Sequence, residues 1–105
     1  MKADYGRLRK ADIPKLESLV RFFGKLQMHC GLHGTSLWNS HYKDVDLLVF
    51  SSKSNPTKFL RMLKSFVKSK NGKLLEERGN PLIGYDVDVR LGRTIFHISY
   101  VLILL

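Results

Sequence analysis

The spacing of the apolar residues changes along this chain of 105 residues, and the change limits the fold to a mixture of helices and strands. In two segments, Ile13 to Met28 and Pro56 to Lys70, apolar residues recur every three or four positions, which is typical of amphipathic helices. From Lys73 onward they recur mainly at every second position, which is typical of strands. We therefore expect an α+β fold.

Residues at the ends of the two helical segments support this interpretation. Asp12 is a favoured N-cap, and Pro14 is tolerated in the first turn of a helix. Pro56 is placed equally well for the second helix, and Asn71 with Gly72 is a common stop signal. Lys and Arg fill the remaining faces of both segments, so each helix is expected to bury one stripe and expose the rest.

Strands are expected before the second helix and after it. The early ones are a short strand from His29 to His33 and a strand from Asp44 to Phe50, with a loop from Ser51 to Asn55. The later ones are the segments KLLEER, PLIGYDVDVRL and TIFHISYVLILL, separated by turns at Gly79, Asn80 and Pro81 and at Leu91, Gly92 and Arg93. This order implies a mixed sheet of about five strands flanked by helices, in a single domain spanning residues 1–105.

The charge balance favours an anionic partner. The chain has 18 Lys and Arg against nine Asp and Glu, a net charge of +9 and a pI near 9.9. A nucleotide or nucleic acid fits this balance, and a basic surface that aids solubility explains it equally well. Cys30 is the one cysteine, so no disulfide is expected and a cytoplasmic location fits. The apolar run from Ile98 to Leu105 is far shorter than the roughly 20 residues of a membrane helix.

Four of the nine acidic residues are concentrated in two Asp-x-Asp triplets within apolar strand segments. They are Asp44 with Asp46, and Asp86 with Asp88. Because a strand has a two-residue period, both carboxylates of a triplet point to the same face. Like charges placed beside a buried strand face are costly unless a cation compensates them. The triplets therefore indicate a divalent metal site.

A Gly-Thr-Ser turn at Gly34, Thr35 and Ser36 precedes the first triplet. Glycine lets the backbone approach a ligand closely, and the amides and hydroxyls of such a turn suit phosphate oxygens. Carboxylates on neighbouring strands beside a phosphate-binding turn are the parts that two-metal phosphoryl transfer requires.

The stretch LHGTSLWNSHYKDVDLLVF resembles the signature of the nucleotidyltransferase superfamily, which includes DNA polymerase β, poly(A) polymerases and CCA-adding enzymes. That signature is an apolar residue, Gly, Gly or Ser, a spacer, and then alternating acidic and apolar residues on a strand. Thr35 departs from it, although Ser36 follows immediately. The later stretch VDVRLGRTIFHISYV is similar to the strand and hairpin that carry the third carboxylate, which would be Asp88.

The resemblance implies a nucleotidyltransferase palm fold and a specific reaction. Asp44, Asp46 and Asp88 would bind two Mg²⁺ ions, and Asp88 would help to deprotonate the acceptor hydroxyl. Gly34 with Thr35 or Ser36 would hold the β and γ phosphates. The enzyme would transfer a nucleoside monophosphate from an NTP, ATP being the first choice, to a hydroxyl acceptor such as RNA, and release pyrophosphate.

Other interpretations of the same residues remain open. The chain can be a catalytically inactive binding module with this fold, such as an RNA-binding adaptor or an antitoxin-like partner of a separate helical protein. A metal-dependent nuclease uses similar acids, and a homodimer or partner chain can complete the site. Asp86 is interpreted as an edge residue or an auxiliary carboxylate. Cys30 and His33 have a zinc-like spacing but lack a second ligand pair, so Cys30 is expected to pack in the core.

Overall fold

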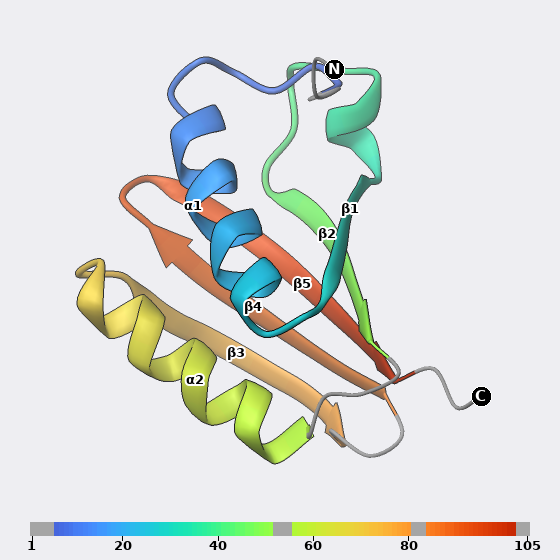
Figure 1. The fold of residues 1–105 in the computed structure, drawn as a ribbon. Helices are drawn as coiled ribbons and strands as arrows, with labels where there is room; N and C mark the ends of the chain where they lie inside the picture. Colours follow the sequence, from blue (N-terminus) through green and yellow to red (C-terminus); the bar gives the residue numbers. More distant parts are fainter. Residues whose placement is uncertain (1–5, 52–55, 81–83, 103–105) are drawn as a thin grey trace.

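The fold is a single mixed sheet with two main helices, as expected from the sequence (Figure 1). The structure is a computed structural model that describes residues 6–51, 56–80 and 84–102. The strands follow the spatial order β1-β2-β5-β4-β3. The β2 and β5 strands are parallel, and the other neighbouring pairs are antiparallel. The elements in chain order are α1 (Ile13–Lys25), β1 (His29–His33), the 3-10 helix η1 (Thr35–Leu37), β2 (Val45–Ser51), α2 (Pro56–Ser69), β3 (Lys73–Asn80), β4 (Gly84–Leu91) and β5 (Thr94–Leu102).

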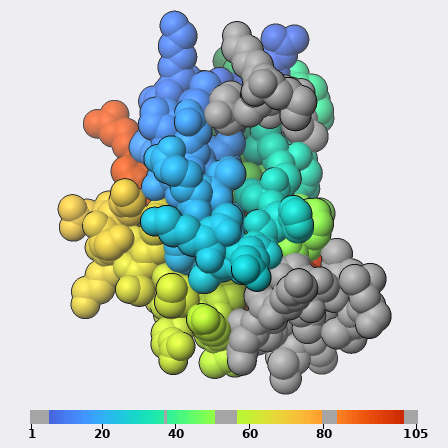
Figure 2. Space-filling model, viewed as in Figure 1, coloured from blue at the N-terminus to red at the C-terminus, as the bar shows by residue number. Residues whose placement is uncertain are grey.

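Both helices lie on the same face of the sheet (Figure 1), and Figure 2 views the molecule from this helical face. The α2 helix contacts β3 and β4, while α1 contacts β1. On the opposite face, none of the described helices covers the sheet. Among the described residues, one face of the sheet is therefore covered by helices and the other is not.

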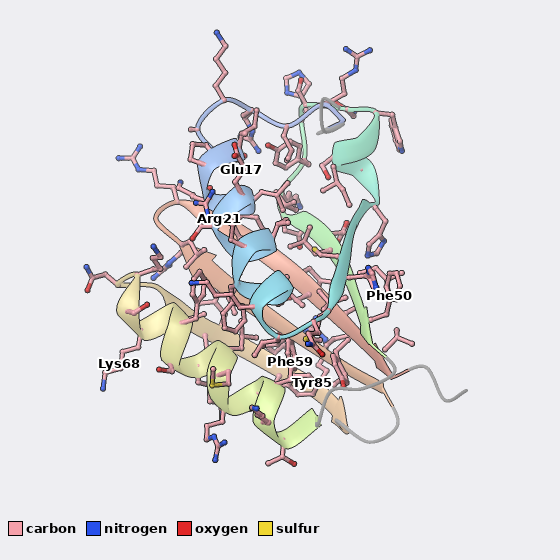
Figure 3. All side chains as sticks on the ribbon, in the orientation of Figure 1. Glu17, Arg21, Phe50, Phe59, Lys68 and Tyr85 are labelled. Carbon is pink, nitrogen blue, oxygen red and sulfur yellow. The ribbon has the colours of Figure 1, made fainter. Side chains whose placement is uncertain are left out.

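The core forms between the helices and every second residue of the strands. In β4 the alternation is complete from Tyr85 to Leu91, where apolar side chains are buried and the residues between them are not. Figure 3 shows Phe59 between α2 and the sheet, whereas Lys68 on the same helix points away from it. The fully buried core side chains include Leu19, Phe23, Val45, Leu47, Val49, Leu63, Val87, Val89, Phe96 and Ile98.

The end of α1 differs from the prediction. The helix stops at Lys25, before the predicted end at Met28, because Gln27 adopts a left-handed conformation with φ 58°. The amide of Met28 then donates to the carbonyl of Phe23, and the amide of Gln27 donates to the carbonyl of Gly24, both at 3.0 Å. This is the bonding pattern of a Schellman C-cap, formed here without glycine at the left-handed position.

The start of α1 also departs from a simple interpretation. Asp12 occupies the N-cap position, as predicted, but its side chain makes no capping hydrogen bond. The carboxylate is buried instead, where it accepts hydrogen bonds from the hydroxyls of Tyr42 and Thr94. Asp12 therefore links the beginning of α1 to residues at the beginnings of β2 and β5.

The strand boundaries agree closely with the sequence. The β2 strand begins at Val45, so Asp44 precedes the strand instead of starting it. The predicted turn at Gly92 and Arg93 joins β4 to β5. Gly79 and Asn80, predicted as turn residues, are instead the last residues of β3, and Ser51, predicted to begin a loop, is the last residue of β2. The rest of that loop (52–55) and Pro81 lie outside the described residues. Among the described helices, none has both the length and the apolar character needed to cross a membrane.

Candidate active site

A row of polar side chains crosses the face of the sheet that lacks helices. The strand registers pair His33 with Asp46, Asp46 with His97, His97 with Asp88, and Asp88 with Glu76. Directly paired residues share a sheet face, so all five side chains emerge on the same side. Their chain neighbours, such as Val45 and Val87, are fully buried in the core on the other side. The site is therefore built by strand alternation.

Asp44 and Asp46 are the centre of negative charge at this site. Asp44 lies immediately before β2 and Asp46 is the second residue of the strand, and both are half-buried. Partial burial is the main factor that raises the pKa of Asp46, followed by the charge of Asp44 and, more weakly, that of Asp88. The nearby His33 and His97 act in the opposite direction. A bound cation would relieve this repulsion.

Gly34 lies directly against the carboxylate of Asp46. Its backbone has φ 80° and ψ −158°, a conformation that L side chains rarely adopt. A Cβ atom at this position would lie 2.2 Å from Oδ2 of Asp46, well inside van der Waals contact. The structure thus brings the predicted glycine turn and the first acidic triplet together, and only glycine fits between them.

The two hydroxyl residues after Gly34 differ in exposure. Thr35 is half-buried, whereas Ser36 is fully buried. Ser36 Oγ is the buried side-chain polar atom that lacks a hydrogen-bond partner among the described residues. Unpaired buried hydroxyls are uncommon in proteins and often mark a place where water or a ligand binds. Of the two alternatives left open by the sequence, Thr35 is the one accessible to a phosphate without rearrangement.

Asp88 is on the same face but in a different environment. Its Oδ1 atom lies 2.6 Å from Nδ1 of His97 and 3.4 Å from Nη2 of Arg78. The 2.6 Å contact needs a proton between the two atoms, and we assign it to the imidazole because Arg78 favours a charged carboxylate. Arg78 also pairs with Glu76 at 2.8 Å. The carboxylate of Asp88 is therefore already held by two partners.

Asp88 is also two strands away from Asp46, because β5 runs between β2 and β4. At the usual strand spacing of about 4.8 Å, their backbones are about 10 Å apart. His97 fills the position between them. Within residues 6–51, 56–80 and 84–102, no group of three or more His, Cys, Asp or Glu side chains is positioned to hold one metal ion. The three aspartates thus share a face without converging on a common point.

The sequence interpretation did not include His97 and Arg78. The alternation in TIFHISY did place His97 opposite the buried Phe96 and Ile98, so its face was predictable. Its neighbours were not predictable, because they depend on which strands pair with β5. Asp86 approaches the other ring nitrogen of His97, with Oδ1 at 3.8 Å from Nε2.

Cys30 packs in the structure as the sequence predicted. It contacts the hydrophobic core from β1, paired with Val49. Burial raises the pKa of its thiol to about 11, so the thiolate that zinc requires is disfavoured. His33, three positions later in the strand, faces the opposite side of the sheet.

The donors around Gly34 fit one Mg²⁺ ion bound together with a nucleotide. Mg²⁺ in phosphoryl-transfer sites is held by one or two carboxylates plus substrate phosphates and water. Asp44 and Asp46 supply such carboxylates, and the backbone of the Gly34 turn lies directly against the carboxylate of Asp46. The imidazole of His97 is a softer ligand than Mg²⁺ prefers. Asp46 and Asp88 do not fit a shared second ion while Asp88 remains bonded to His97 and Arg78.

Comparison with known proteins identifies the fold. No protein-family model matches the sequence, and no curated protein matches it by sequence. Among solved structures, Cid1 poly(U) polymerase with MgGTP bound matches with a TM-score of 0.61 at 11% identity. A Cid1 structure concerned with its RNA terminal uridylyl transferase activity gives 0.54 at 10% identity, and a mutant bound to MgATP gives 0.52 at 14%.

Each of these matches covers 90% of this chain but only 33%, 32% and 33% of the respective polymerase chain. This chain therefore spans about a third of the length of the structures that it matches. The TM-scores establish the architecture. At these low identities, the chemistry has to be argued from the site itself. The helices, the mixed sheet and these matches together show that the chain has the nucleotidyltransferase fold.

Proposed function

We propose that this chain is a Mg²⁺-dependent nucleotidyltransferase, which transfers a nucleoside monophosphate from an NTP to a hydroxyl acceptor and releases pyrophosphate. The observation that carries the proposal is the close contact of Gly34 with Asp46, by which the backbone of the glycine turn lies directly against a carboxylate that is paired with Asp44. The same fold in Cid1 poly(U) polymerase is bound to MgGTP and MgATP. ATP is the nucleotide that we propose to test first.

Each part of the turn and the first triplet has a role in the proposal. Asp44 and Asp46 would hold the ion, and Mg²⁺ when bound supplies charge that offsets the phosphates and the leaving pyrophosphate. Gly34 lets the backbone of the turn lie against Asp46, so that the amides of the turn and the Thr35 hydroxyl can donate to a phosphate oxygen beside the ion. Their positions next to Asp46 support a single nucleotide site at the junction of β1, η1 and β2.

Asp88 is proposed as the third acid, in accord with the sequence resemblance. In that role it would accept the proton of the attacking hydroxyl. Its present bonds to His97 and Arg78 both engage Oδ1, so Oδ2 would accept this proton unless those bonds are exchanged when the substrate binds. Without that exchange, the proton on Nδ1 of His97 remains hydrogen-bonded to Oδ1 of Asp88.

A second candidate function is supported by the same network. With Asp88 held by His97 and Arg78, the fold can bind a nucleotide without transferring it, as an inactive binding module. Such a protein would still use Asp44, Asp46 and Gly34 for binding. Binding and transfer therefore have to be measured separately.

The test compares α-labelled ATP transfer to an RNA oligonucleotide by the wild type, Asp46→Asn and Asp88→Asn. Glu17→Gln is the matched control, because it also removes one negative charge but lies on α1, on the other side of the sheet (Figure 3). We expect transfer by the wild type and by Glu17→Gln, and a loss of about 100-fold or more in both aspartate variants. Mg²⁺ with ATP should raise the thermal midpoint of the wild type and leave that of Asp46→Asn unchanged.

Two outcomes would change the conclusion. A wild type that binds Mg²⁺ and ATP but labels none of the RNA, protein or small-molecule acceptors offered to it is the binding module. A wild type that gains nothing from Mg²⁺ and ATP, or an Asp46→Asn variant that gains as much, contradicts both functions.

A further inference from the structure

A cationic pocket lies at the edge of the sheet where β2 and β5 begin, which is the end of the sheet at which Asp44 lies. Its volume is about 230 Å³, and it is enclosed by the start of α1 and by the residues before β2 and around the start of β5. Four of the residues that line it are basic: Arg9, Lys15, Lys43 and Arg93. We name this feature the basic pocket.

The floor of the basic pocket is a fixed network of hydrogen bonds. Asp12, only 7% exposed, accepts from the hydroxyl of Tyr42 and, at 2.5 Å, from the hydroxyl of Thr94. Lys15 donates to the same Thr94 hydroxyl at 2.9 Å. Arg9 donates to the carbonyl of Tyr42 at 2.7 Å and stacks on its ring, with 4.2 Å between the guanidinium carbon and the ring centroid. Two of the four cations are therefore held in place by the fold.

The described residues that line the basic pocket do not balance its positive charge. Asp12 is the one acidic residue in its lining and carries one negative charge against four positive ones. Lys43 and Arg93 are exposed, and within the described part of the chain neither forms an ion pair or a hydrogen bond. Converging cations without counter-charges raise the local concentration of anions, and phosphate accepts several charge-assisted hydrogen bonds at once.

The position of the pocket relates it to the candidate active site. Lys43 directly precedes Asp44, and Thr94 begins β5, the strand that is parallel to β2. Parallel strands start at the same edge of a sheet, so the pocket adjoins the end at which Asp44 lies. The Gly34 turn is on the β1 side of β2, whereas β5 is on the other side. The nucleotide and an anion in the basic pocket would therefore approach Asp44 and Asp46 from different sides.

We infer that the basic pocket binds a backbone phosphate of a single-stranded polynucleotide, which presents its terminal hydroxyl to Asp44 and Asp46. The part of this inference that concerns the terminal hydroxyl rests on the proposed function. The part that concerns phosphate binding does not. Trp38, 69% exposed, does not line the pocket but follows η1 near the Gly34 turn, where it is a surface on which a base can stack. Cations for the phosphates together with an exposed aromatic ring are typical of surfaces that bind single strands without reading their sequence.

The test measures RNA binding without catalysis. A labelled single-stranded RNA is titrated by fluorescence anisotropy with the wild type and with the double variant Lys43→Gln/Arg93→Gln, without Mg²⁺ or nucleotide, at several salt concentrations. The matched control is Arg61→Gln/Lys68→Gln, which removes two exposed cations from α2. Among the described residues, neither pair has an ion-pair partner that would affect folding, and the thermal midpoints of all proteins are compared first.

We expect the pocket variant to bind RNA about 10-fold or more weakly at low salt, and the control less than about 3-fold. The salt dependence should also fall, by about 0.7 in the slope of log K against log salt for each phosphate that the variant no longer neutralises. Equal binding by the pocket variant and the control would overturn the inference. So would a pocket variant that keeps its RNA affinity but loses its thermal response to Mg²⁺ and ATP, because the pocket would then serve the nucleotide.

The Asp46→Asn variant separates this inference from the proposed function. It should bind RNA at least as tightly as the wild type, since Asp46 is outside the basic pocket and the change removes a negative charge. If nucleotidyl transfer is absent but the pocket variant still loses RNA affinity, the proposed function fails and the phosphate site remains. If transfer is present and the pocket variant binds RNA normally, the phosphate site fails and the proposed function remains.

Discussion

At the scale of single residues, the site depends on the lack of a side chain at Gly34 and on the partly buried carboxyl group of Asp46. Gly34 has a positive φ and lies where a Cβ would collide with the carboxylate of Asp46. Partial burial and the neighbouring charge of Asp44 raise the pKa of Asp46. Both features cost stability in the free protein, and a cation bound at Asp46 with a phosphate beside the turn would offset that cost.

The first prediction concerns Gly34→Ala. The methyl group would sit 2.2 Å from Asp46 Oδ2 in a backbone conformation that disfavours any side chain. We expect a loss of about 1–3 kcal/mol in the free energy of unfolding and a displaced carboxylate that no longer responds to Mg²⁺ and ATP. Urea unfolding and thermal shift measure the two effects. Gly31→Ala is the control, since a Cβ at Gly31 would meet nothing within 4 Å and the φ of this residue is not positive. Equal stability and equal thermal response of the two variants would refute this role of Gly34.

The second prediction concerns the pH dependence of stability. Burial and the charge of Asp44 raise the pKa of Asp46 above its ordinary value of 3.8, so the folded protein holds this proton more tightly than the unfolded chain. Stability contributed by Asp46 is therefore lost as pH rises through 3.8 toward the folded pKa, and the loss persists at neutral pH. Without metal, Asp46→Asn should thus be more stable than the wild type at pH 7.

The measurement for Asp46→Asn is urea unfolding in EDTA at several pH values. The difference from the wild type should shrink toward acid pH, where Asp46 is protonated in both states. Added Mg²⁺ with ATP should reverse the order of stability, because only the wild type gains binding energy. A variant that is less stable than the wild type at pH 7 without metal would show that the charge of Asp46 stabilises the fold.

At the scale of secondary-structure elements, the ends of the elements are joined by side chains that are distant in sequence. Asp12 at the start of α1 is bonded to Tyr42 before β2 and to Thr94 at the start of β5. These bonds fix the helix over the end of the sheet at which Asp44 lies. The same three elements form the floor and walls of the basic pocket.

The third prediction tests this junction with Tyr42→Phe. The change removes one hydrogen-bond donor from the buried Asp12 carboxylate and keeps the ring, so we expect a loss of about 1–3 kcal/mol in the free energy of unfolding. Tyr85→Phe is the control, because its hydroxyl bonds to the more exposed Glu77 and should matter less, at about 1 kcal/mol or below. An effect of Tyr42→Phe no larger than that of the control would mean that Asp12 does not depend on this bond.

The sequence predicts elements well where the information is local. Apolar periodicity predicted both helices and the strands, and the Gly34 turn with Asp44 and Asp46 is a single continuous stretch. The end of α1 was wrong because Gln27, a residue without a strong stop preference, adopts the left-handed conformation. The partners of Asp12 were not predictable because Thr94 is 82 positions away.

At the scale of the whole molecule, the order of the strands decides which functional groups meet. The sequence predicted that Asp88 shares a face with Asp44 and Asp46, but not that β5 lies between β4 and β2. That order inserts His97 into the row of acids and brings Arg78 to Asp88. Register is set by pairing across the sheet, so no local pattern could reveal the His97 contacts. Because β2 and β5 are parallel, the residues before β2 and those at the start of β5 lie at the same end of the sheet, where they form the basic pocket near Asp44.

The most direct test of the account is where a metal-nucleotide binds on this molecule. Mn²⁺ with ATP can be titrated into isotope-labelled protein, because the paramagnetic ion broadens amide resonances steeply with decreasing distance. We expect broadening first at Gly34, Thr35, Asp44 and Asp46, with α2 residues such as Lys68 unaffected, and no selective broadening in Asp46→Asn. Broadening that is uniform, or that centres on another surface while the Gly34 and Asp46 signals persist, would contradict a nucleotide site at this turn.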